Sequence, residues 1–244
     1  MIWPSRISSN AIVAALMVGA LPLPIPAAIV SGSVQPINAR AGGKNRDYSG
    51  VVVWLEPSDG ATPVLKPKTV QMIQKNKRFV PRVLAVPLGT TVSFPNLDPI
   101  FHNVFSNFSG QVFDLGLYSP GKVPAVRFQR TGFVRVFCNI HASMSAVIAV
   151  LPSPYLAISD TNGSFTFRDV PPGEYRFHVF HERSTGESLQ ALDAELTVGH
   201  ENITLAPMRL SESDSVQVPH KNKYGRDYPP VVEDRPMYPA GAKR

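Results

Sequence analysis

The chain has few of the features that usually define a protein class at first sight. It contains one cysteine in 244 residues, so no disulfide forms within it. Its extended apolar run, AIVAALMVGAL at residues 11–21, is shorter than the about 20 residues of a membrane-spanning helix. Long heptad patterns are absent, which argues against a coiled coil.

The N-terminus has the layout of a secretory signal peptide. Arg6 supplies a positive charge, the apolar run follows, LPLPIP cannot continue a helix, and the small pair Ala27-Ala28 comes next. Residues 1–28 are therefore predicted to be a signal peptide cleaved after Ala27 or Ala28, with cleavage after Ala41 as an alternative. The expected location is periplasmic, with no stable membrane span after cleavage. The other alternative is an uncleaved anchor.

The rest of the composition predicts an all-β protein. Apolar residues make up 43% of the chain and charged residues 17%, within the globular range. Short runs rich in Val, Phe, Ile and Thr recur between Gly, Pro, Asn and Asp, as in a sandwich or barrel. Strands are expected at residues 51–55, 70–74, 82–86, 91–94, 102–105, 112–115, 125–128, 132–137, 145–151, 155–159, 164–168, 173–180, 191–198 and 202–205. The polar segment 211–244 is expected to be disordered or loosely draped.

Charge divides unevenly along the chain. Residues 66–151 carry ten Lys or Arg against two Asp, a net charge of +8, whereas residues 152–210 carry four Arg against eight Asp or Glu, a net charge of −4. The basic cluster at residues 66–82 could steer an acidic partner. Nucleic acid is not expected as a partner, because the chain is exported and shows no nucleic-acid motif. The alternative is a solvated face without a partner.

The one cysteine belongs to the stretch FCNIHASM, in which Cys138, His141 and Met144 are each three residues apart. Val134, Val136 and Cys138 alternate along a predicted strand, so the thiol should face the core with the two valines. A lone cysteine in an exported protein bridges molecules, reacts or binds a metal. Two kinds of sulfur with an imidazole favour copper over zinc.

A second histidine lies 36 residues upstream of the cysteine, in PNLDPIFHNVFS. His102, Cys138, His141 and Met144 together make the two-histidine, one-thiolate set with a weak thioether that holds blue copper. The ordinary alternatives are a turn histidine at 102, a small buried thiol at 138 and a core methionine at 144.

The segments FVPRVLAVPLGTTVSFPNLDPIFHNV and GFVRVFCNIHASMSAVIAV resemble the two ends of a cupredoxin, over roughly residues 67–151. The short ligand loop is similar to that of amicyanin- and plastocyanin-like members. The resemblance implies a Greek-key sandwich, one copper ion cycling between Cu(I) and Cu(II), and a bond from Asn103 across to the loop carrying Cys138. The chain departs from the family at Ala142, where proline is common, and at the neighbours of the cysteine.

Residues 152–210 resemble a carboxypeptidase regulatory-like, or transthyretin-like, sandwich, through Asp160, Asn162-Gly163, Phe165, the Pro-Pro-Gly turn and Tyr175. Its opening strands are missing there, but IVSGSVQ and SGVVVWLEP within residues 29–66 resemble them. The hypothesis is that the cupredoxin is inserted into this second sandwich. Bacterial exported proteins with both modules are often labelled methylamine utilization proteins, although no amine site is visible in these residues.

Three functions follow, from different classes. The first is a one-electron carrier between a dehydrogenase and a cytochrome-like acceptor, with an exit through His141 and a docking patch of Phe101, Ile140 and Ala142. The second is a copper carrier or store, and the third an assembly or adhesion module with a structural metal. An enzyme is not expected, because four ligands leave no position for substrate and the thiol faces inward.

Overall fold

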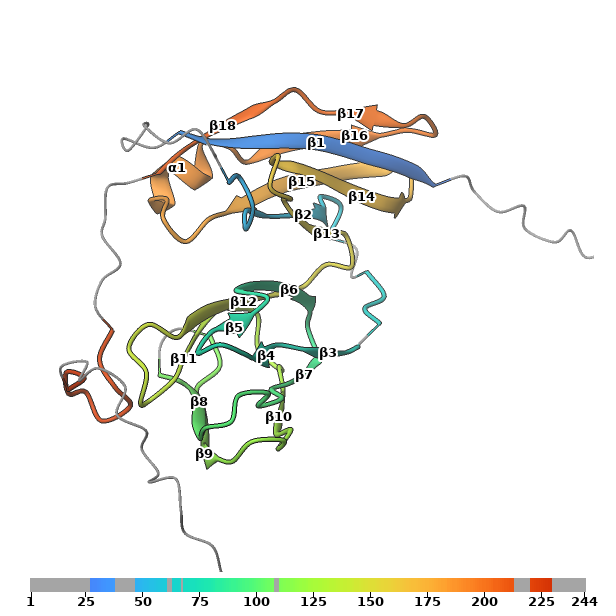
Figure 1. The fold of residues 1–244 in the computed structure, drawn as a ribbon. Helices are drawn as coiled ribbons and strands as arrows, with labels where there is room; N and C mark the ends of the chain where they lie inside the picture. Colours follow the sequence, from blue (N-terminus) through green and yellow to red (C-terminus); the bar gives the residue numbers. More distant parts are fainter. Residues whose placement is uncertain are drawn as a thin grey trace, which may run out of the picture.

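The computed structural model describes residues 27–37, 47–60, 63–66, 68–107, 110–212 and 220–229. These residues form two β-sandwiches, one above the other in Figure 1. The predicted signal peptide lies outside the described residues, apart from Ala27 and Ala28. Within the described part of the chain, no helix is both long and apolar enough to cross a bilayer.

The first sandwich is built from ten strands between residues 69 and 151. One sheet has the order β6-β12-β11-β8-β9, the facing sheet has the order β10-β7-β3, and β4 pairs with β5. The strands are β3 (Thr69–Gln71), β4 (Ile73–Gln74), β5 (Phe79–Val80), β6 (Val83–Pro87), β7 (Thr91–Ser93), β8 (His102–Ser106), β9 (Phe113–Tyr118), β10 (Ala125–Arg127), β11 (Gly132–Phe137) and β12 (Ser145–Leu151).

The core of this sandwich lies between its two sheets and includes the fully buried Phe94, Val104, Phe128 and Ile148. The predicted bounds of β11 and β12 match the observed ones. Strand β12 is apolar on both faces, as SAVIAVL shows, because both faces are covered. Ala146, Ile148 and Val150 face the sandwich core, whereas Ala149 and Leu151 pack toward the second sandwich.

The second sandwich combines strands from before and after the first one. Its sheets have the orders β14-β1-β17, with β18 also on β1, and β13-β2-β15-β16. The elements are β1 (Ala28–Ile37), β2 (Val52–Pro57), β13 (Leu156–Ile158), β14 (Ser164–Val170), β15 (Gly173–Phe180), α1 (Gly186–Gln190), β16 (Ala194–Val198), β17 (Ile203–Thr204) and β18 (Met208–Ser211). Strand β2 pairs with β13 and β15 rather than with the first sandwich, which is the pairing that the insertion hypothesis requires.

The prediction of a strand over residues 191–198 was too long. Helix α1 and a turn occupy residues 186–193, so β16 begins only at Ala194. The hydroxyl of Thr185 accepts a hydrogen bond from the backbone N–H of Ser188 at the start of the helix, which explains why the chain turns helical there.

A third apolar cluster joins the two sandwiches. Phe133 of β11 stacks on Phe180 of β15 with ring centroids 3.6 Å apart, and Trp54 of β2 meets Phe133 edge-on. Val52 and Leu151 are buried in the same cluster. The two sandwiches therefore share a packed interface and are not joined by linkers alone.

Candidate metal centre

The strand that carries Cys138 points its thiol inward, as predicted. Val134, Val136 and Cys138 are all fully buried, because alternate residues of a strand share a face. The residues after β11 then form a tight loop, 138–144, in which the backbone N–H of Cys138 donates to the carbonyl of Met144 and that of Met144 to the carbonyl of His141. Because three of the four predicted ligands lie in it, we call residues 138–144 the metal-binding loop.

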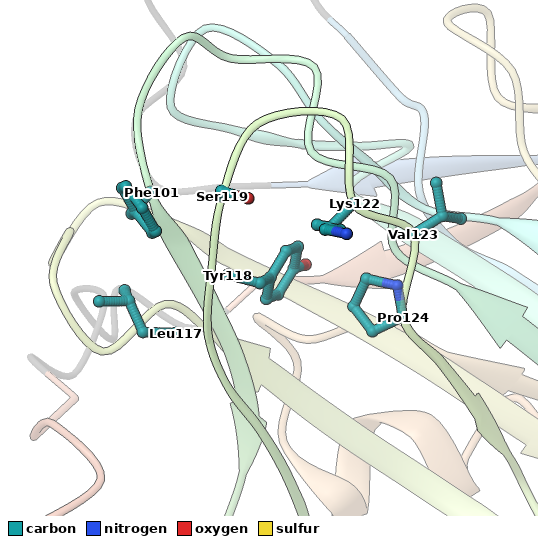
Figure 2. A pocket seen from close by; sticks show the side chains of 7 residues that line it. All are labelled: Phe101, Leu117, Tyr118, Ser119, Lys122, Val123 and Pro124. Atoms are coloured by element: carbon teal, nitrogen blue, oxygen red, sulfur yellow. The ribbon is translucent and has the colours of Figure 1, made fainter. Parts of the chain in front are cut away.

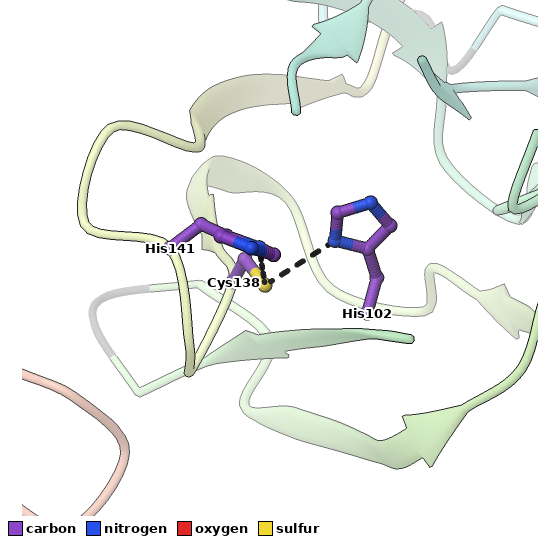
Figure 3. Close-up of side chains that lie close together, drawn as sticks. All are labelled: His102, Cys138 and His141. Carbon is purple, nitrogen blue, oxygen red and sulfur yellow. Dashed lines mark hydrogen bonds between the residues drawn. The ribbon is translucent and has the colours of Figure 1, made fainter. Parts of the chain in front are cut away.

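His102 reaches the same place from the neighbouring strand β8. Its Nδ1 lies 3.8 Å from the sulfur of Cys138, and Nδ1 of His141 lies 3.6 Å from that sulfur. Figure 3 shows both rings turned toward the sulfur. Within the described ranges, these three residues form the group of potential ligands whose donor atoms all lie within 4.8 Å of one another.

Met144 is fully buried in the core cluster that also holds Cys138. It immediately precedes β12, whereas Cys138 follows β11 and His102 begins β8, so all three lie at one end of one sheet. The role of Met144 as a ligand stays a prediction.

The two sulfur–nitrogen separations fit a single bound cation. Donors about 2.0–2.3 Å from one ion, with angles of about 110–120° between them, lie about 3.3–4.0 Å apart. The measured 3.6 and 3.8 Å fall in this range. A soft thiolate with two imidazoles suits copper or zinc, and a nearby thioether favours copper.

Burial affects the protonation of His102 and Cys138. It lowers the pKa of His102, against the opposing effect of Asp98, so the ring is neutral and can bind a metal at neutral pH. Burial raises the pKa of the Cys138 thiol, although the backbone N–H groups of Asn103, Ile140 and His141 lower it. Binding of a cation therefore displaces a thiol proton.

Asp98 is the residue at this centre that the sequence analysis missed. Its carboxylate lies 2.8 Å from Nε2 of the fully buried His102 and accepts the backbone N–H groups of Asn76 and Lys77. The contact with Nε2 leaves the Nδ1 lone pair of His102 directed at the cluster. The signal was available in the sequence DPIFH, in which an acid lies four residues before the histidine.

Replacing Asp98 with Asn is expected to weaken metal binding about 10- to 100-fold, because the carboxylate no longer orients His102. Burial would raise the pKa of Asp98, but the hydrogen bonds from Lys77, His102 and Asn76 hold it below its usual value. The carboxylate thus stabilises the fold only while ionised. As pH falls through this pKa, the wild type should lose stability that the variant never had.

Competition with a chelator measures the affinity, and thermal unfolding from pH 7 to pH 3 measures the stability. Asp169→Asn is the matched control, since Asp169 is exposed and Asn tolerates its positive φ of 56°. Equal affinities for the two variants would contradict the role of Asp98.

The predicted bond from Asn103 across to the loop carrying Cys138 is made by its backbone N–H, whereas its side chain bonds elsewhere. Its Nδ2 donates to Asp114 and to the carbonyl of Gly116, both at 2.7 Å, and not to the metal-binding loop. Strand β9 lies beside β8 on that side and supplies both acceptors. Only the backbone N–H of Asn103 points at the sulfur of Cys138.

An open pocket of about 550 Å³ lies beside the centre (Figure 2). One of its residues, Tyr118, pairs with His102 across the β8–β9 ladder. The lining residues are Phe101, Leu117, Tyr118, Ser119, Lys122, Val123 and Pro124. Leu97, Phe101, Leu117 and Ile140 are large apolar side chains that are exposed in this part of the molecule.

No protein-family model and no curated protein matches the chain. Solved structures do. A copper-containing nitrite reductase from Thermus scotoductus is 25% identical over 39% of this chain and 25% of its own, with a TM-score of 0.33. A purple cupredoxin from Nitrosopumilus maritimus is 24% identical over 34% of this chain and 99% of its own, with a TM-score of 0.31. A Cu(I) amicyanin variant is 16% identical over 34% of this chain and 82% of its own, with a TM-score of 0.32.

This chain spans a quarter of the length of the nitrite reductase. Its own strand order, with a cysteine and two histidines converging at one end of a five-stranded sheet, defines a cupredoxin-like sandwich within an all-β chain.

Proposed function

We propose that the chain is an exported protein that binds one copper ion through His102, Cys138, His141 and Met144 and acts as a one-electron carrier. The observation that carries the proposal is the convergence of His102 and Cys138, 36 residues apart, with their donor atoms at 3.8 Å. Copper bound there would supply a Cu(I)/Cu(II) couple.

The chain itself supplies rigidity and the exclusion of water. His102, Cys138 and Met144 are fully buried, and they lie on or next to neighbouring strands of one sheet. These three donors cannot separate without disturbing that sheet, whereas His141 lies on the metal-binding loop between β11 and β12. A site that moves little between two oxidation states suits electron transfer better than metal delivery, which needs an accessible ion.

Voltammetry of the copper-loaded mature protein separates the three candidate functions. A carrier should give a reversible one-electron response with the ion retained. Release of copper on reduction would favour a store, and a bound metal without any redox response would favour a structural site.

The proposed partner is a redox protein, either a dehydrogenase or a cytochrome-like acceptor. The apolar side chains of Phe101 and Ile140 are exposed near the centre, and the first sandwich carries the basic excess. An acidic partner should therefore exchange electrons more slowly at high ionic strength. A rate that does not change with salt would exclude electrostatic steering.

We propose a periplasmic location after removal of the signal peptide, and the place of β1 in the fold favours one of the predicted cleavage sites. Ala28 and Val30 are fully buried in β1, and β1 pairs with β14, β17 and β18. Cleavage after Ala41 would remove this strand from the middle of its sheet. The mass of the exported protein should therefore correspond to a start at Ala28 or Ile29, and a start at Gly42 would contradict this assignment.

A further inference from the structure

Residues 220–229, which we call the strap, lie against the metal-binding loop although they follow it by about 80 residues. In Figure 1 the strap is drawn in red beside the first sandwich. The sequence predicted that residues 211–244 are disordered or loosely draped. Within them, the strap lies on the surface of the first sandwich and contacts the metal-binding loop. Residues 213–219 and 230–244 lie outside the described part of the chain.

The strap contacts the loop on both sides of the ligand His141. The ring of His220 stacks on Phe137 with centroids 4.0 Å apart, and its Nε2 donates to the carbonyl of Ala142 at 2.9 Å. The hydroxyl of Tyr228 donates to the carbonyl of Cys138 at 2.7 Å. Both carbonyls lie beyond the β11–β12 ladder, which ends at Phe137, so the strap provides their hydrogen bonds.

Lys223 connects the strap to the other ligand-bearing segment. Its backbone N–H donates to Oδ1 of Asn139 in the loop, and its ammonium group donates to Asp114 at 2.7 Å. Asp114 in turn accepts the side chain of Asn103, the residue after the ligand His102. The strap therefore bridges the two parts of the chain that supply the donors.

The strap has a conformation of its own. Oδ1 of Asn222 accepts the backbone N–H groups of Tyr224 and Arg226, and Gly225 closes the turn with a φ of +75°. A locally closed turn loses less entropy on docking than an extended tail does.

We propose that the strap is a positioning element of the metal centre, with Tyr228 as the residue that holds the metal-binding loop in its ion-binding conformation. This inference rests on the proposed function, because it assigns the strap to the same site. Coupling of this kind is reciprocal. Loss of the strap contact weakens metal binding, and loss of the metal loosens the strap.

The test compares Tyr228→Phe with Tyr224→Phe in the full mature chain. Both changes remove one hydroxyl from the strap, but Tyr224 is 69% exposed, whereas Tyr228 bonds to the ligand residue itself. Hydrogen exchange of the amides of Cys138 and Met144 is measured in the metal-free proteins. The rate at which copper leaves the loaded proteins for excess chelator is measured separately.

Tyr228→Phe should speed both exchange and copper release about 5- to 10-fold, the size expected for one hydrogen bond beside a ligand. Tyr224→Phe should match the wild type in both. The proposal is overturned if the two variants behave alike, or if Tyr228→Phe changes exchange without changing copper release, which would make the strap a cover only. If the wild type binds no copper, the proposed function fails, and the exchange data alone decide whether the strap orders the loop.

Discussion

Cys138→Ser is expected to abolish the intense visible absorption that copper(II) gives to the wild-type protein. The absorption of a blue-copper site depends on the bond between copper and a thiolate, and a hydroxyl cannot replace that soft ligand. Affinity for copper should fall by at least about 100-fold, the upper end of what loss of an outer-shell partner produces. Titration with copper(II), followed by absorption, measures both effects.

A control must separate loss of the ligand from loss of the fold. Serine also places a hydroxyl in a fully buried position, which destabilises by about 1–3 kcal/mol. Val136→Thr places a hydroxyl on the same buried face of β11 and leaves the thiol intact, so it should keep the absorption. An unchanged spectrum in Cys138→Ser would remove the basis for the proposed copper site.

Gly163→Ala is expected to have a large effect on stability. Gly163 has a φ of +82°, and a Cβ there would lie 2.0 Å from the carbonyl oxygen of Val34 and 3.2 Å from Cβ of Tyr48. Val34 belongs to β1 and also donates its N–H to the carbonyl of Gly163 at 2.9 Å. Because β1 is fixed by strands on both sides, the clash cannot relax. We expect a loss of about 3 kcal/mol or more, measured by urea unfolding.

Gly121→Ala is the matched control for that substitution. Gly121 also has a positive φ, of +77°, but no atom lies within 4 Å of its would-be Cβ. Its replacement should therefore show only the backbone penalty of about 1–2 kcal/mol. Similar losses for both variants would mean that β1 does not press against the turn at Gly163, contrary to the pairing of the second sandwich.

Much of the fold was predictable because the side-chain pattern of a strand is visible within a few consecutive residues of the sequence. The alternation of GFVRVF and the apolar run SAVIAVL fixed the bounds of β11 and β12. Residues 191–193 were wrongly assigned to a strand and the helix at residues 186–190 was not predicted, since ESLQAL has no alternation that separates a short helix from a strand. The resemblance of IVSGSVQ and SGVVVWLEP to opening strands indicated where β1 and β2 belong, but only their pairing with β14 and β15 placed them there.

The candidate metal centre was also predictable only in part. Spacing within FCNIHASM and the position of His102 indicated a soft metal set, and the strand period placed the Cys138 thiol in the core. Family resemblance indicated a bond from Asn103 to the loop carrying Cys138, and only the structure shows that the backbone N–H makes this contact while the side-chain acceptors lie on β9.

The sequence by itself determined which residues face inward and which donor types are available, because both follow from periodicity and residue chemistry within a few positions. Only the tertiary structure decided that Tyr228 meets Cys138 and that Lys223 reaches Asp114, since hydrogen bonds between residues about 90 to 110 positions apart leave no pattern in the local sequence.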